Sequence, residues 1–142
     1  MPELELYNCQ EAIEFDLAGL NRRCREAFEV VLSSTESTVL AEFDEVEMSI
    51  VGDEEIARIH GEFMDDPTPT DVITFQHGEL VISAETAAQE ANSRSWPVER
   101  ELLLYLIHGF LHLQGFDDHE PEDRERMHAK QNAILDEIWP PA

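Results

Sequence analysis

The order of apolar and polar residues in the first third of the chain predicts a strand followed by a helix. Apolar and polar side chains alternate over residues 4–8, as they do in a strand with one buried face. Asp16 is a favoured N-terminal cap, and the residues after it form one apolar stripe at helical spacing, which predicts a helix over residues 17–32. The stripe comprises Leu17, Leu20, Cys24, Phe28, Val31 and Leu32.

The middle of the chain is expected to contribute most of a sheet. Alternation returns over residues 39–51 and predicts two short β segments with a turn between them. Asp53 is placed to cap a short helix, and the loop that follows over residues 64–70 contains two prolines. Residues 71–75 and 79–83 are then expected to form two further strands joined by a tight turn.

The last part of the chain is expected to be helical. Ser83 can cap a helix over residues 84–93, and Pro97 suits the first turn of a long helix that extends to Gln114. This second helix is apolar almost all round, so we expect it to be buried at the centre of the protein. Pro121 begins a last amphipathic helix, whose apolar residues are Met127, Ile134, Leu135 and Ile138.

These elements predict one α+β domain over residues 1–142, with a small mixed β-sheet of about four strands packed with helices mainly on one face. The sequence shows neither a signal peptide nor an apolar run of the roughly 18 residues that a membrane span requires. Cys9 and Cys24 form neither a metal-binding spacing nor a disulfide framework. We therefore expect two ordinary buried thiols, a reducing cytoplasm and no membrane partner.

The charge is strongly unbalanced, because 32 acidic residues accompany only 9 basic ones and the formal net charge is −23. Such a surface repels polyanions, so composition alone argues against a nucleic-acid partner. A lysine-poor acidic surface is also an adaptation to high salt, where the Debye length falls to about 3 Å at 1 M, and we hold that adaptation as a hypothesis. Arg22, Arg23 and Arg25 are expected to form a solvated helix face, with a phosphate-contacting patch as the alternative.

A pair of histidines on the long helix is the strongest chemical signal. His108 and His112 are four residues apart, so both rings project from one side of the helix. Gly115 is expected to end the helix and let the chain fold back, so that Asp118 or His119 supplies a third ligand. Three protein ligands leave one position of a zinc ion open for the water that a catalytic site activates.

The alternative is that both histidines are core residues bound to backbone carbonyls. A lone histidine on an apolar helix is usually of that kind. Here the pair lies within the most hydrophobic segment of the chain, where an unpartnered polar ring is costly to bury. The sequence therefore favours one bound divalent ion, zinc or another metal, on the central helix and the loop after it.

Three motifs resemble the YbeY family of metal-dependent endoribonucleases, also called rRNA maturation factors. The segment HGFLHLQGFDD over residues 108–118 resembles the family signature HGxLHLxGYDH, whose first, fifth and eleventh positions are the metal ligands. Residues 69–75 and 78–83 resemble two further segments, PTDVLSF and GDIVIC, in the same order and spacing. The resemblance implies a single-domain α+β fold, a zinc ion, cleavage of single-stranded RNA, 16S rRNA 3′-end processing and a part in ribosome assembly.

The sequence departs from the family pattern at two positions. The eleventh position of the signature is Asp118, and a histidine, His119, comes one residue later. Both side chains suit zinc, and Asp118 keeps the family spacing whereas His119 keeps the family chemistry. Six residues before Thr70, where the family places an arginine, this chain has Met64. Either Arg94 or Arg100 supplies the cation instead, or the activity is weak.

Two other functions compete with the nuclease. A zinc peptidase also begins its motif with two such histidines, but the residue that should be its glutamate base is Gly109 here. A non-catalytic protein could use the metal to hold its loop and dock on a ribosomal protein or an assembly GTPase, which the acidic surface and Met64 favour. No side chain is assigned as the general base, so the catalytic group is expected to be the metal's water alone.

Several polar residues near these motifs are expected to be structural. His60, His77 and His128 are expected to be solvent-facing or locally hydrogen-bonded, although His77 could border the cleft. Thr70 and Asp71 are expected to fix their loop through side-chain-to-backbone hydrogen bonds rather than to touch substrate.

Overall fold

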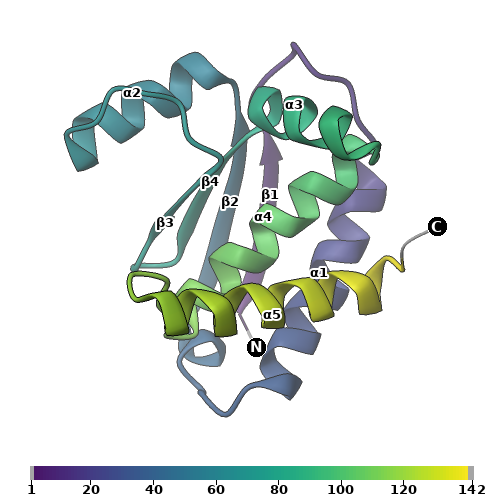
Figure 1. The fold of residues 1–142 in the computed structure, drawn as a ribbon, viewed down its shortest axis with the longest axis vertical. Helices are drawn as coiled ribbons and strands as arrows, with labels where there is room; N and C mark the ends of the chain where they lie inside the picture. The colour runs from purple at the N-terminus through teal and green to yellow at the C-terminus, as the bar shows by residue number, and fades with distance from the viewer. Residues whose placement is uncertain (1, 141–142) are drawn as a thin grey trace.

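The computed structural model describes residues 2–140, which form four strands and six helices, one of them a single 3₁₀ turn. The order along the chain is β1 (Glu3–Asn8), α1 (Leu17–Ser34), η1 (Leu40–Glu42), β2 (Glu45–Val51), α2 (Asp53–Met64), β3 (Val72–Phe75), β4 (Glu79–Ser83), α3 (Ala84–Arg94), α4 (Val98–Leu113) and α5 (Pro121–Ile138). This is the predicted α+β fold with a four-stranded mixed sheet (Figure 1).

The sheet combines two parallel pairs with one hairpin. Its strand order is β1-β2-β4-β3, in which β1 pairs with β2 and β2 with β4 in parallel, whereas β3 and β4 are antiparallel. Each parallel pair requires a crossover connection, and α1 and α2 occupy those connections. In this strand order β3 lies at one edge of the sheet, and it directly follows the proline-containing loop.

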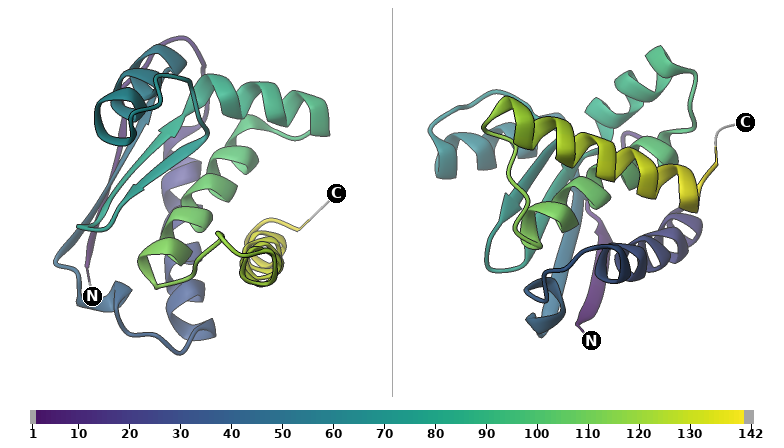
Figure 2. Two further views of the ribbon diagram at one scale, coloured as in Figure 1. Left: turned by 60° about the vertical axis from the view of Figure 1, so that its left-hand side comes forward. Right: turned by 60° about the horizontal axis from the view of Figure 1, so that its bottom comes forward.

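The two faces of the sheet are covered unequally. Figure 2 shows α1 and α4 against one face, with α5 packed outside them, and α2 on the other face. The large core lies under α1 and α4, where side chains of alternating strand residues such as Met48, Ile50, Leu80 and Ile82 are fully buried. The small core under α2 is formed by Val51, Ile56, Ile73 and Val81.

The long apolar helix α4 is the buried centre of the protein, as its composition predicts. Twelve of its residues are buried, and it contacts α1, α3, α5 and the sheet. Gly109 lets α4 approach β4 closely, because a Cβ at this position would lie 2.6 Å from Cδ1 of Leu80. The same packing turns the neighbouring His108 side chain away from the sheet, toward α5 and the loop that follows α4.

The structure corrects three local predictions. Of the two β segments expected over residues 39–51, only the second forms, because Leu40 donates its backbone N–H to the Gln114 side chain at 2.8 Å and begins a 3₁₀ turn. Asp53 is the first residue of α2 and not its cap; its carboxylate accepts hydrogen bonds from Ser83 and Thr86 instead. Cys9 is exposed, since it lies just beyond the end of β1.

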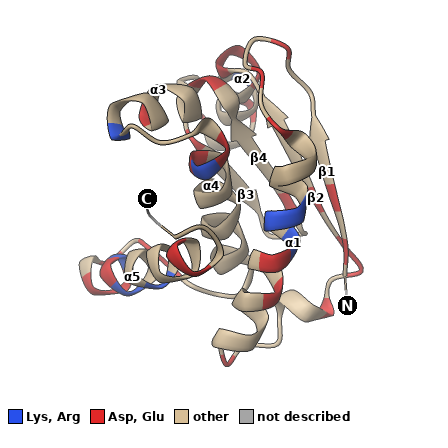
Figure 3. Ribbon diagram, turned by 90° about the vertical axis from the view of Figure 1, so that its right-hand side faces the viewer, with Lys and Arg blue, Asp and Glu red and all other residues tan. Residues whose placement is uncertain are grey.

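The surface carries acidic residues on nearly every element, as Figure 3 shows, and basic residues at few places. Two of the three clustered arginines on α1 make structural contacts: Arg23 stacks on Trp139, and Arg25 donates to the Leu4 carbonyl oxygen. Over residues 2–140, no helix is both long and apolar enough to cross a membrane.

Candidate metal centre

The end of α4 and the turn after it are fixed by backbone hydrogen bonds. Gly115 has φ of +103°, and its N–H donates to the His112 carbonyl while the Phe116 N–H donates to the Leu111 carbonyl. This pair of bonds is the Schellman motif, in which a glycine with positive φ reverses the chain. The turn brings Asp118, three residues later, back beside the last turn of α4.

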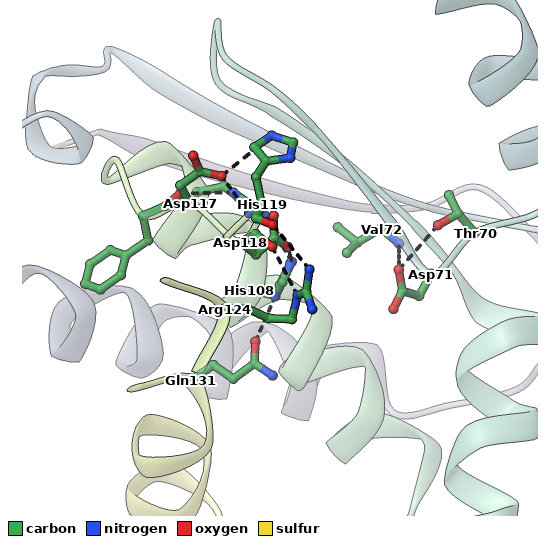
Figure 4. A network of polar contacts seen from close by, with 11 residues as sticks. Thr70, Asp71, Val72, His108, Asp117, Asp118, His119, Arg124 and Gln131 are labelled. Carbon is green, nitrogen blue, oxygen red and sulfur yellow. Dashed lines mark hydrogen bonds and ion pairs between the residues drawn. The ribbon is translucent and has the colours of Figure 1, made fainter. Parts of the chain in front are cut away.

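Three ligand-type atoms converge at this point. The Nε2 atoms of His108 and His112 are 3.1 Å apart, and the Asp118 Oδ2 atom lies 3.6 Å and 3.4 Å from them. All three side chains are partly buried, and they form one of the two groups in the described chain that could hold a metal ion. Figure 4 shows His108 with Asp118 on one side of it and Gln131 on the other.

The second nitrogen of each ring is held by an oxygen. His112 Nδ1 lies 3.1 Å from the Phe116 carbonyl oxygen, which can only accept, so Nδ1 carries the proton and Nε2 presents a lone pair. His108 Nδ1 lies 2.8 Å from Oε1 of Gln131 on α5, which has the same effect. Burial lowers the pKa of His108 and so favours the neutral ring. Such outer hydrogen bonds orient metal-binding histidines in many proteins.

The donor set fits a divalent ion. When both rings are neutral and donate through Nδ1, two Nε2 lone pairs face each other 3.1 Å apart and repel, and a cation between them removes this repulsion. A tetrahedral ion with bonds of about 2.0–2.2 Å holds its ligand atoms about 3.3–3.6 Å apart. The measured distances of 3.1–3.6 Å agree with this within a few tenths of an ångström.

The other candidate ligand, His119, lies outside this group. Its side chain is 85% exposed, and its Nε2 lies 3.6 Å from Asp117 rather than beside the two helix histidines. It belongs to the second of the two groups that could hold a metal ion, which is formed by Asp117, Asp118 and His119. Of the two residues that the sequence left open as the third ligand, the geometry brings Asp118 to the histidine pair.

The remaining histidines have local roles. His60 Nδ1 lies 2.9 Å from the Thr68 carbonyl oxygen, and His77 stacks on Phe75 and pairs with Glu79. His128 is exposed on α5, with its ring 6.4 Å from that of His108. None of the three joins the His108–His112–Asp118 group.

Thr70 and Asp71 lie across a cavity from the metal group. Asp71 accepts from the Val72 N–H at 2.7 Å, so it fixes the entry to β3 as expected. The cavity has a volume of about 390 Å³ and is also lined by His60 and Met64. All four candidate ligands, His108, His112, Asp118 and His119, line it as well. The cavity is therefore open to a molecule that reaches the metal group.

No lysine or arginine is among the described residues that line this cavity. Met64 occupies its rim with 47% of its surface exposed. Arg100 cannot substitute for a cation here, because its guanidinium donates to Asp136 and to the Trp139 carbonyl and lies over the Trp96 ring. Arg94 lines a second cavity that begins at His108.

Two supporting residues were missed by the sequence analysis. Gln131 is a polar residue in line with the buried stripe of α5, and that position could have indicated a polar partner on the central helix. Arg124 donates to the Asp118 and His119 carbonyls at 3.2 Å and 3.3 Å and so braces the loop (Figure 4). No local signal distinguishes Arg124 from Arg126, the other surface arginine of α5.

Comparison with known proteins agrees with the fold and the motifs. The chain matches the family described as Endoribonuclease YbeY over residues 5–139. It is 36% identical to the Endoribonuclease YbeY of Bacillus pumilus (strain SAFR-032), with 66% of this chain and 71% of that protein covered. It is 31% identical to that of Rhodococcus opacus (strain B4), with 84% and 79% covered.

The solution structure of TM1509 from Thermotoga maritima is similar over 96% of this chain and 89% of that one. The TM-score is 0.62 at 25% identity. The α+β fold is thus shared with a solved structure, and the match to the family extends over nearly the whole chain. The chain belongs to the YbeY endoribonuclease family.

Proposed function

We propose that this protein is a zinc-dependent endoribonuclease that hydrolyses single-stranded RNA, with an rRNA precursor as its substrate. The observation that carries the proposal is the convergence of two histidine Nε2 atoms and one carboxylate oxygen beside an open cavity. Family membership supports the reaction class. A role in 16S rRNA 3′-end processing and ribosome assembly, in the cytoplasm, is the finer part of the same proposal.

The side chains of the site have distinct roles in this proposal. His108, His112 and Asp118 would hold the ion, which when bound polarises the phosphodiester and lowers the pKa of water toward about 7. Gln131 and the Phe116 carbonyl keep both rings oriented through their Nδ1 atoms. The carboxylate of Asp118 reduces the net charge of the centre relative to three neutral ligands, so it favours harder ions more than a third histidine would.

The cavity wall opposite the metal group would guide the RNA strand. The loop that ends at Thr70 and Asp71 borders the metal group from the side of β3, and its conformation is fixed by the Asp71–Val72 hydrogen bond. A strand that crosses the metal group must pass between this loop and the turn after α4. This loop and this turn would then determine where the RNA backbone lies relative to the ion.

An RNA cleavage assay tests the proposal. A labelled, unstructured RNA of about 20 nucleotides should be cut by the zinc-loaded wild-type protein, whereas chelation or His108→Ala should abolish cutting. His77→Ala is the matched control, because His77 is an exposed histidine outside both cavities. If His108→Ala cuts as fast as wild type, the proposed reaction is wrong.

A second function is favoured by one observation, the absence of lysine and arginine among the described residues around the metal cavity. A metal-stabilised protein that binds a ribosomal protein or an assembly GTPase needs no cation beside a phosphate. The second function is supported if a pull-down at matched salt captures such a partner with the zinc-loaded wild type but not with His112→Ala, while neither protein cuts RNA. A peptidase is disfavoured, because Gly109 packs on Leu80 and leaves no room for a glutamate base.

A further inference from the structure

A second cavity begins where the metal cavity ends. It has a volume of about 550 Å³, within the range of about 300–1,000 Å³ for small-molecule sites. The two cavities share His108 and the residues Thr70, Asp71 and Val72, so they meet at the metal group. A nucleic-acid strand held at the ion would therefore place one of its neighbouring nucleosides in this second cavity.

Two buried polar atoms at this cavity have no hydrogen-bond partner. Glu101 is 1% exposed and Tyr105 is 4% exposed, and both line the cavity from α4. The Oε1 atom of Glu101 and the hydroxyl oxygen of Tyr105 are two of the three such side-chain atoms in the described chain. A buried polar group without a hydrogen bond is destabilising, so a ligand that supplies hydrogen-bond partners to these two atoms is favoured.

The chemistry of the cavity selects for a neutral ligand that donates hydrogen bonds. Asp71, Glu90 and Glu101 are acidic, and Arg94 is the single lysine or arginine among the described lining residues. Arg94 already lies 3.6 Å from Glu90 and 3.8 Å from Glu101, so a phosphate would compete with two carboxylates. A metal ion is also disfavoured, because these carboxylates do not form a group that could hold one.

We propose that this cavity binds the nucleobase next to the scissile phosphate and that Glu101 and Tyr105 make it selective for guanine. The inference rests on the proposed nuclease function. Guanine has two adjacent donors on one edge, N1–H and the 2-amino group, and a carboxylate accepts two parallel hydrogen bonds. Adenine and cytosine present a single amino group beside an acceptor nitrogen, which would face a carboxylate oxygen. Uracil has a single N–H between two carbonyl oxygens.

Arg94 covers Glu101 in the free protein. Its side chain is 43% exposed, so it can move without disturbing the core, and its guanidinium lies 5.1 Å from the Trp96 ring. A planar guanidinium stacks well on a nucleobase. Once the base has displaced Arg94 from its 3.8 Å ion pair with Glu101, Arg94 can lie over the base.

The test compares oligonucleotides that differ at one base. Unstructured oligouridine strands that carry a single guanine, inosine or adenine are assayed for kcat/KM of cleavage beside that base. Inosine lacks only the 2-amino group. The wild-type protein should cut beside guanine about tenfold to a hundredfold faster than beside inosine, the effect of one lost hydrogen bond to a charged group.

Glu101→Gln should lower the ratio of kcat/KM beside guanine to kcat/KM beside inosine to about one, because a glutamine side chain accepts with one oxygen only. Tyr105→Phe should weaken the preference, and Glu137→Gln, an exposed acid on α5, should leave it unchanged. A purely structural role of Glu101 would instead slow all substrates equally. An equal rate beside all three bases, or a guanine preference that survives Glu101→Gln, overturns the inference.

Failure of the nuclease proposal gives a different result. If the zinc-loaded protein cuts no RNA, the same oligonucleotides are compared by binding, through the chemical shifts of the Tyr105 and Gln131 side chains. Binding that distinguishes guanine from inosine supports the base site even without cleavage. Binding that does not distinguish them rejects the base site on its own.

Discussion

Zinc binding should raise the melting temperature of this protein, because the three candidate ligand atoms are brought together only in the folded state. The ion would join the last turn of α4 to the loop after it through His108, His112 and Asp118. At a free zinc concentration of about 100 times Kd, linkage adds about 2.7 kcal/mol of stability. For a chain of 142 residues, an unfolding entropy of about 2.1 cal/mol/K per residue gives about 0.3 kcal/mol/K, so the melting temperature should rise by about 9 °C.

Substitutions at two adjacent residues distinguish the third ligand. Asp118→Ala should lose most of the zinc-induced shift, because only two ligand atoms remain, whereas His119→Ala should keep the shift close to that of wild type. Differential scanning fluorimetry with and without chelator measures both. The outcome that refutes the geometry is a full shift in Asp118→Ala together with a lost shift in His119→Ala. A wild-type protein that zinc does not stabilise would reject the metal centre altogether.

Three further predictions concern the fold around the site. Gly115→Ala should reduce the free energy of unfolding in urea by roughly 1–2 kcal/mol, because φ is +103° and an added Cβ meets no other atom that could offset the strain. A thiol reagent should modify Cys9 in the native protein and Cys24 only after unfolding, since Cys24 is buried and its pKa is raised to about 12; modification of both in the native protein would contradict this. Stability measured in 0.1 M and 2 M KCl should be higher at high salt because of the net charge of −23, and an unchanged midpoint would reject adaptation to salt.

The part of the site that the sequence predicts is the part built by local geometry. His108 and His112 share a helix face by their spacing alone, and Gly115 ends the helix because glycine adopts positive φ readily. The same holds for the caps of α1 and α3, where Asp16 and Ser83 accept the hydrogen bonds expected of them. Such features depend on residues within one or two turns of each other.

The features that the sequence did not predict depend on contacts between distant segments. The partner of Leu40 is Gln114, 74 residues away, and this contact replaces a strand with a 3₁₀ turn. The contact between His108 and Gln131 depends on how α5 crosses α4, which periodicity does not specify. Residue identity also left the third ligand open, because Asp118 and His119 both suit zinc and only the path of the turn separates them.

The acidic surface and the proposed nuclease activity are compatible if affinity for RNA comes from contacts at close range. Long-range attraction is not available, because the net charge is −23 and the described residues around the metal cavity include no lysine or arginine. A divalent ion at the His108–His112–Asp118 group would then be the strongest positive charge beside the scissile phosphate. At 1 M salt the Debye length is about 3 Å, so repulsion from the distant acidic surface is screened while direct contacts to the ion and to a buried base persist. In a basic nuclease the same salt would remove most of the binding energy, since that energy comes from phosphate contacts.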